Sequence, residues 1–187
     1  MQTEAKALPN PGAAHAVVVG GGTMGADVAV VLTRAACRTT VIEPDAARAA
    51  ALPARVAENL KTIGREAQVA QLATAASLDQ VDWASVDLVI ECVPERLDIK
   101  QALFAELVRR ARPDAILASN SSSFPISAIG QGLAHIAHTS TGQGNQATAF
   151  FQPGALHFCS PLVLVAQPGT GQNVAQAQVT SLVLHQQ

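Results

Sequence analysis

The chain has 187 residues, of which 49% are hydrophobic, and a formal net charge of −2. This length and composition are typical of one globular domain with a sizeable core. The sequence contains no basic patch, no block of like charges and no apolar run near the ~20 residues that span a bilayer. We therefore expect neither a nucleic acid nor a membrane as partner.

The three cysteines, Cys37, Cys92 and Cys159, stand far apart and lack the CxxC spacing of metal and redox sites. They are typical of reduced thiols, so the sequence predicts a cytoplasmic protein without a metal site. Residues 1–14 are polar and contain proline. We interpret them as a loose leader rather than a signal peptide.

The first predicted elements surround a glycine-rich turn. A short apolar strand is expected at 16–19 and a helix at 24–36, with Gly20-x-Gly22-x-x-Gly25 between them. In a dinucleotide site Gly20 allows the tight turn, Gly22 lets the backbone approach the pyrophosphate, and Gly25 lets the helix pack close to the strand. The free N–H groups at the start of the helix then face the two phosphates.

A second strand is predicted at 39–42, and it ends in Glu43, 18 residues after Gly25. An acid at this place meets the ribose hydroxyls of the adenosine and favours NAD over NADP, because it repels a 2′-phosphate. The alternative interpretation is a glycine-rich turn in another kind of α/β protein, with Glu43 merely solvated.

The rest of the chain alternates helices with strands. A helix is expected at 46–64 with a kink or break at Pro53. The further elements are a short strand within 69–76, a strand at 88–93, a helix at 97–110 and a strand at 115–118. This pattern predicts a Rossmann-type α/β fold, a doubly wound and mainly parallel sheet. Ligands of such sheets bind beyond the carboxyl ends of the strands, so the loops at 20–25, 43–45, 92–96 and 119–123 are expected to converge.

Three ordered motifs resemble the NAD-binding domain of the 3-hydroxyacyl-CoA dehydrogenase family. They are Glu-Cys-Val-Pro-Glu-Arg-Leu-Asp-Ile-Lys at 91–100, Leu-Phe at 103–104, and Ala-Ser-Asn-Ser-Ser-Ser at 118–123. The family's pattern is E-x-x-x-E-x-L-x-x-K, then L-F, then S-N-[TS]-S-S. The sequence Cys-Val-Pro-Glu is more similar to the branch of the family that contains lambda-crystallin and L-gulonate dehydrogenase. The resemblance covers roughly residues 15–130. It implies oxidation of the 3-hydroxyl of an acyl-CoA to a ketone by hydride transfer to NAD, as in fatty acid β-oxidation.

The resemblance also implies roles for individual residues. The cofactor-binding positions would be Gly20, Gly22, Thr23, Met24, Gly25, Glu43, Glu95, Lys100, Ser122 and Ser160. The catalytic residues would be Ser122, which orients the substrate hydroxyl, and His157, which takes its proton. Substrate contacts would come from Ser122, Lys61 and Arg65. A solvated helix face for Lys61 and Arg65, a turn cluster for the serines and a structural histidine at 157 are the alternatives.

The segment 154–161 resembles the family's G-L-H-F-F-N-P strand, with Ser160 in place of the usual Asn. In the family a Glu in a following L-V-E-V segment steers the histidine. Here that segment reads Leu-Val-Ala-Gln at 164–167, and all 12 Lys and Arg and all 14 Asp and Glu stand before Ala115. A histidine without a carboxylate partner is a poorer base.

These departures lead to a hypothesis about domain organisation. We expect an NAD-binding domain at 15–166 with an atypical insertion at 131–153, and an uncertain tail at 167–187. In this hypothesis the sequence has no counterpart of the family's helical second domain, which closes the substrate cleft and forms the dimer. Part of the sequence after about Gly130 then does not derive from ordinary selection for this fold. The alternatives are therefore a truncated, non-catalytic NAD-binding module, a half-enzyme that needs a helical partner, or another 3-hydroxy acid dehydrogenase. The apolar surface left exposed would favour a homo-oligomer.

Overall fold

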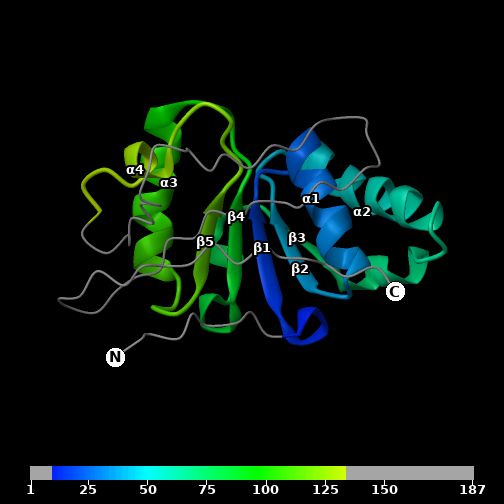
Figure 1. The fold of residues 1–187 in the computed structure, drawn as a ribbon. Coiled ribbons are helices and arrows are strands. Elements are labelled where there is room, and N and C mark those ends of the chain that lie inside the picture. The colour runs from blue at the N-terminus through cyan, green and yellow to red at the C-terminus, as the bar shows by residue number, and fades with distance from the viewer. Residues whose placement is uncertain (1–9, 134–187) are drawn as a thin grey trace, which may run out of the picture. The chain divides into compact units, whose positions relative to one another are not determined.

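The computed structural model describes residues 10–133 (Figure 1). These residues fall into two compact units that divide between Val93 and Pro94. The helices and strands are β1 (His15–Val19), α1 (Thr23–Arg34), β2 (Arg38–Ile42), α2 (Ala46–Lys61), β3 (Leu72–Ala75), β4 (Leu88–Glu91), α3 (Leu97–Arg110), β5 (Ile116–Ser119) and α4 (Ile126–Ile129). Short 3-10 helices lie at Pro11–Ala13, Glu66–Gln71, Leu78–Gln80 and Trp83–Ser85. The first unit contains β1 to β4, and the second contains α3, β5 and α4.

The four strands of the first unit form a parallel sheet in the order β3-β2-β1-β4. Val17 at the middle of β1 lies opposite Thr40 of β2 on one side and Val89 of β4 on the other. The chain thus proceeds outward from β1 to β3 and then returns to the other side of β1. This reversal is the switch point of a doubly wound Rossmann-type sheet, and it confirms the predicted fold class.

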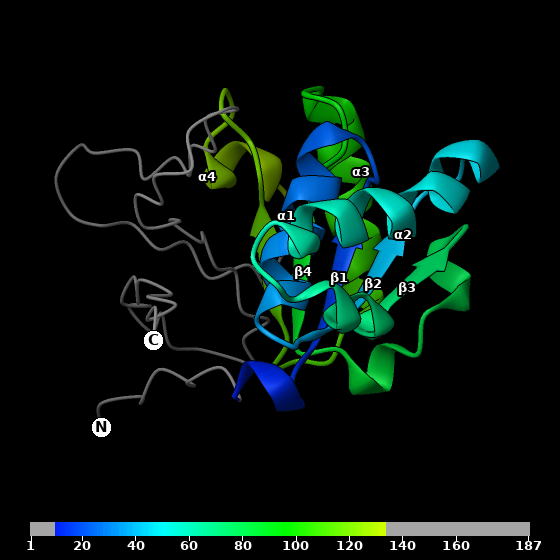
Figure 2. The ribbon, with the colours of Figure 1, turned by 90° about the vertical axis from the view of Figure 1, so that its right-hand side faces the viewer.

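The core of the first unit explains why these segments form strands and helices. All five residues of β1 are buried, as expected for a strand covered on both faces. The helices α1 and α2 lie side by side along the strands (Figures 1 and 2). Leu52, Val56 and Leu60 follow one another at intervals of four residues along α2 and are at most 2% exposed, so they form its buried face.

Of the two outcomes predicted at Pro53, the break is excluded, because the helix runs without interruption from Ala46 to Lys61. The kink stays a prediction. A proline cannot donate to the carbonyl four residues before it. Pro53 is exposed, however, so water can replace the missing donor. The side chain of Asp45 caps the start of the helix, since its Oδ1 accepts a hydrogen bond from the backbone N–H of Arg48 at 2.8 Å.

The second unit is built on α3, which has the predicted bounds Leu97–Arg110. Phe104 and Leu107 are completely buried on one face of α3. The short helix α4 packs against it, and Gln101 Nε2 donates to the carbonyl of Ala128 at 2.9 Å. Within residues 10–133, no helix has the length and apolar character that crossing a bilayer requires.

A polar cluster around the buried side chain of His15 lies at the amino end of β1. Arg38 Nη2 lies 2.6 Å from His15 Nδ1, and His15 Nε2 lies 3.0 Å from Thr40 Oγ1. Because a guanidinium only donates, Nδ1 accepts and the proton of the neutral imidazole lies on Nε2, from which it is donated to Thr40. Burial, together with the positive charge of Arg38, lowers the pKa of His15, although Asp87 and Asp82 act in the opposite direction.

This lowered pKa predicts that the free energy of unfolding falls at mildly acidic pH. The unfolded chain binds a proton at His15 near pH 6.5, whereas the folded protein binds it only at lower pH. The stability is therefore complete above about pH 7.5 and decreases as the pH falls through 6.5, by about 1.4 kcal/mol for each unit by which the pKa is lowered. Urea unfolding at pH 8, 7 and 6 measures this change, and His15→Gln is expected to flatten it. An equal slope in the variant would contradict this assignment.

Candidate functional site

The glycine-rich loop turns sharply after β1. Gly20 has a φ of +104°, which side-chain-bearing residues rarely adopt, and a Cβ at this position would lie 2.6 Å from the carbonyl oxygen of Cys92. The N–H of Gly20 donates to the carbonyl of Ile42 at 2.9 Å. The loop is therefore held against the carboxyl ends of both neighbouring strands, β2 and β4, at the switch point of the sheet.

The start of α1 presents backbone N–H groups next to open space. Gly22 is the N-cap residue and provides no side-chain cap, and no atom of residues 10–133 lies within 4 Å of a Cβ built on it. Thr23 is exposed and Met24 is half-buried. The first N–H groups of a helix have no partner within it, so this end of α1 favours a bound anion.

Gly25 fixes the distance between the helix and the loop. A Cβ on Gly25 would lie 1.7 Å from the carbonyl oxygen of Gly20, which no rearrangement of side chains could relieve. The close approach of α1 to the turn therefore requires a residue without a side chain at position 25.

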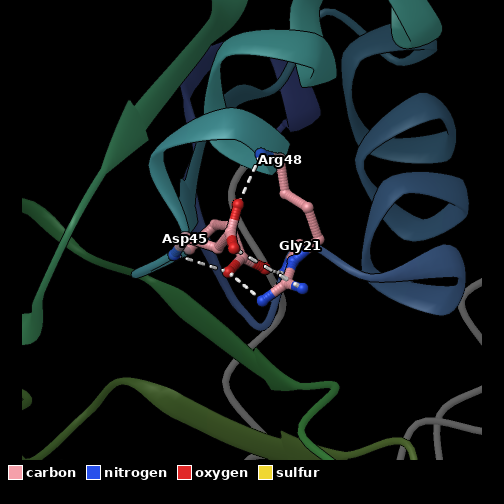
Figure 3. Close-up of polar contacts among 4 residues, drawn as sticks. Gly21, Asp45 and Arg48 are labelled. Atoms are coloured by element: carbon pink, nitrogen blue, oxygen red, sulfur yellow. Dashed lines mark hydrogen bonds and ion pairs between the residues drawn. The ribbon is translucent and has the colours of Figure 1, made fainter.

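The carboxylate of Glu43 ties the loop to β2 and α2 (Figure 3). Its Oε2 accepts from the N–H of Gly21 at 3.0 Å, and its Oε1 accepts from the N–H of Asp45 at 2.9 Å and from Arg48 Nη2 at 3.0 Å. The residue is only 4% exposed. Burial alone would raise the pKa of Glu43, but the three hydrogen bonds outweigh it and hold the pKa below its ordinary value. Glu43 is thus a buried, ionised carboxylate beside the glycine-rich loop.

In the second unit, Glu95 is the centre of a separate network. Its Oε1 accepts from Ser121 Oγ at 2.5 Å and from the N–H of Ser123 at 2.8 Å, and its Oε2 lies 3.2 Å from Lys100 Nζ. Ser121 Oγ also accepts from the N–H of Phe124 at 3.0 Å. Lys100 is completely buried. Burial would raise the pKa of Glu95, but the hydrogen bonds from Ser121, Ser123 and Lys100 lower it overall.

The serines after β5 differ in their surroundings. Ser122 and Ser123 are exposed, and Ser121 is buried. Glu95 accepts hydrogen bonds from the hydroxyl of Ser121 and from the backbone N–H of Ser123. Sequence reasoning selected Ser122 and missed Ser121, because three consecutive serines give no indication of which one is buried. The structure brings together Glu95, Lys100 and the backbone that carries Ser122.

Lys61 and Arg65 are not brought to the glycine-rich loop. Lys61 is exposed at the last turn of α2, and Arg65 Nη1 donates to the carbonyl of Arg34 at 3.1 Å. Arg34 ends α1, about 16 Å along the helix from Thr23 at 1.5 Å per residue. The remaining predicted residues, His157 and Ser160, lie outside the described residues.

Comparison with known proteins identifies the family. The model of the protein family described as "3-hydroxyacyl-CoA dehydrogenase, NAD binding domain" matches residues 15–167. A 3-hydroxybutyryl-CoA dehydrogenase of Mycobacterium tuberculosis is 40% identical over 117 residues, which are 58% of this chain and 41% of that protein. A fatty acid oxidation complex subunit alpha of Ectopseudomonas oleovorans is 32% identical over 131 residues, 65% of this chain and 18% of that protein.

A solved structure agrees with these matches. The crystal structure of 3-hydroxybutyryl-CoA dehydrogenase from Escherichia coli has 30% sequence identity and a TM-score of 0.57, and the match covers 64% of this chain and 27% of that one. The chain therefore spans less than half of the length of each of these relatives. By the match of 153 of its 187 residues, the chain belongs to the 3-hydroxyacyl-CoA dehydrogenase family, and the matched part is the family's NAD-binding domain.

Proposed function

We propose that this chain provides the cofactor-binding part of an NAD-dependent dehydrogenase that oxidises the 3-hydroxyl of an acyl-CoA, or of a related 3-hydroxy acid, to a ketone. The observation that carries the proposal is the contact between Glu43 and Gly21, which holds an ionised carboxylate against the glycine-rich loop. The relatives named 3-hydroxybutyryl-CoA dehydrogenase support the class of substrate.

The residues of the first unit fit NAD. The open space at Gly22 leaves room for a pyrophosphate, and the N–H groups at the start of α1 suit its negative charge. Glu43 Oε2 accepts one hydrogen bond from Gly21, and a carboxylate oxygen has the capacity to accept a second, from a ribose hydroxyl.

The chemistry requires a hydride acceptor, a positioned hydroxyl and a base. NAD, when bound, supplies the acceptor. In our proposal Ser122 orients the substrate hydroxyl by a hydrogen bond, and His157 takes its proton. The hydroxyl of Ser122 is too weak a base to do this alone. Ser160 contacts the cofactor in this proposal. Lys61, in the last turn of α2, and Arg65, after it, contact the substrate.

Calorimetric titration of the full chain with NADH tests the cofactor site. Glu43→Gln removes the negative charge and keeps the shape of the side chain, so the affinity for NADH is expected to fall about tenfold. Glu58→Gln is the matched control, because Glu58 is an exposed carboxylate on α2 and should leave the affinity unchanged. Equal affinities of wild type and a folded Glu43→Gln variant, or no binding by the wild type, would refute the proposal.

A second candidate is a non-catalytic NAD-binding module. It is favoured by the absence of any Asp or Glu between residues 115 and 187 that could steer His157. An absorbance assay of NADH oxidation with acetoacetyl-CoA, run on the protein used for calorimetry, separates the two. Turnover supports the dehydrogenase, and cofactor binding without turnover supports the module.

A further inference from the structure

The buried carboxylate of Glu43 has a cationic partner at the surface. Arg48 Nη2 donates to Glu43 Oε1 at 3.0 Å, and Arg48 Nη1 lies 3.9 Å from Asp45 Oδ2. The side chain of Glu43 is 5% exposed, whereas that of Arg48 is 59% exposed. The guanidinium of Arg48 therefore lies at the surface, next to the buried acid. Figure 3 shows Arg48 together with Gly21 and Asp45.

The backbone holds Arg48 in this position. Its N–H donates to Asp45 Oδ1 at 2.8 Å in the N-cap of α2, so the residue is fixed through both its main chain and its side chain. A guanidinium has five N–H donors. In Arg48 one nitrogen donates to Glu43 and Nη1 lies 3.9 Å from Asp45 Oδ2, but the side chain is 59% exposed. The remaining donors are able to bind a second anion, in the planar geometry that suits a phosphate.

The local charge decides which cofactor this corner accepts. Glu43 and Asp45 contribute two negative charges and Arg48 one positive charge. A ribose hydroxyl is neutral, but a 2′-phosphate adds a charge of about −1.5 to −2. Glu43 repels such a group, and Arg48 attracts it.

We propose that Arg48 is a specificity-determining residue, which reduces the discrimination of this site against a dinucleotide that carries a phosphate on the adenosine ribose. The inference rests on the proposed cofactor site. It adds that the choice between NAD and NADP depends on the pair Glu43–Arg48 and not on the acid alone.

Dissociation constants of the full chain for NADH and NADPH, measured at low ionic strength, test the inference. Weak NADPH binding is measured by competition against NADH. In Arg48→Ala the affinity for NADPH is expected to fall about tenfold, equivalent to about 1.4 kcal/mol, while the affinity for NADH changes less than about twofold. Arg48→Lys should keep part of the NADPH affinity, and high salt should reduce the difference between wild type and variant.

Arg109→Ala is the matched control. Arg109 is 68% exposed and pairs with a carboxylate, that of Glu106, on α3. Its removal subtracts the same charge from the protein without affecting the NADPH-to-NADH ratio. The inference is wrong if the ratio of the NADPH and NADH affinities stays constant in Arg48→Ala, including when both affinities fall equally. It is also wrong if NADPH, at its highest soluble concentration, does not displace NADH from the wild-type protein. In either case the proposed NAD site stands. A wild type that binds neither cofactor would overturn the proposed function, and this inference with it.

Discussion

Gly25→Ala is expected to lower the free energy of unfolding by about 3 kcal/mol or more, a large part of the stability of a domain of this size. The added methyl group would lie 1.7 Å from the carbonyl oxygen of Gly20, and the N–H of Gly20 is itself bonded to the carbonyl of Ile42. To relieve the collision, α1 must move away from β1 and expose part of the core. Urea denaturation followed by circular dichroism measures the loss, and a variant as stable as wild type would contradict the close packing.

Gly22→Ala, three residues earlier, is the matched control for this prediction. Among the described residues, no atom lies within 4 Å of the added methyl group, and Gly22 has a φ of −65°, which alanine adopts readily. Alanine is a poorer N-cap than glycine, so the free energy of unfolding should fall by about 0.5–1 kcal/mol, much less than in Gly25→Ala. The affinity for NADH should nevertheless fall about tenfold or more, because the methyl group occupies the place of the pyrophosphate. The two alanine variants thus separate the role of Gly25 in protein stability from the role of Gly22 in cofactor binding.

Glu95→Ala is expected to cost about 2–3 kcal/mol of stability. It removes the carboxylate that lies 3.2 Å from the completely buried ammonium group of Lys100, and it removes the acceptor of Ser121 Oγ and of the N–H of Ser123. Breaking a fully buried ion pair costs about 3–5 kcal/mol. We expect less because the side chain of Glu95 is 32% exposed, so water reaches part of the pair.

A double-mutant cycle with Lys100→Met tests the cause of this loss. The methionine keeps most of the volume of lysine and removes its charge. If the stability of Glu95→Ala is lost because a buried charge lacks its counter-ion, then the double variant should be less destabilised than the sum of the two single variants by about 1 kcal/mol or more. Additive effects in chemical denaturation would show that the ion pair contributes nothing beyond packing.

The sequence predicted the helices and strands best where one physical requirement dominates. The apolar positions of 97–110 recur at helical spacing, and α3 has those bounds. Residues 66–71 instead form a 3-10 helix, so β3 is confined to Leu72–Ala75 within the predicted range 69–76. The helix α2 continues through Pro53, because the local penalty of a proline is smaller than the gain from burying Leu52, Val56 and Leu60 on one helix face.

In the candidate site, the sequence predicted the backbone turn at the glycines but not the side-chain contacts. Gly20 and Gly25 follow from spacing, and the structure has the tight turn and the close helix there. The tie between Glu43 and Gly21 depends on how far the side chain reaches across the sheet edge, which spacing does not specify. The same holds for Ser121, since its burial depends on the position of Glu95, and for Arg65, whose partner at the end of α1 is 31 residues away in sequence.

The carboxylate of Glu43 has a consequence for the entropy of ligand binding. Its three donors come from the loop, from the chain after β2 and from α2, and all of them are protein atoms. The loop is therefore already ordered by the fold, so the binding of a dinucleotide carries no entropic cost for ordering the loop. We expect the loop to lose its structure together with the sheet rather than before it, so slow amide hydrogen exchange at Gly21 should match that of β1.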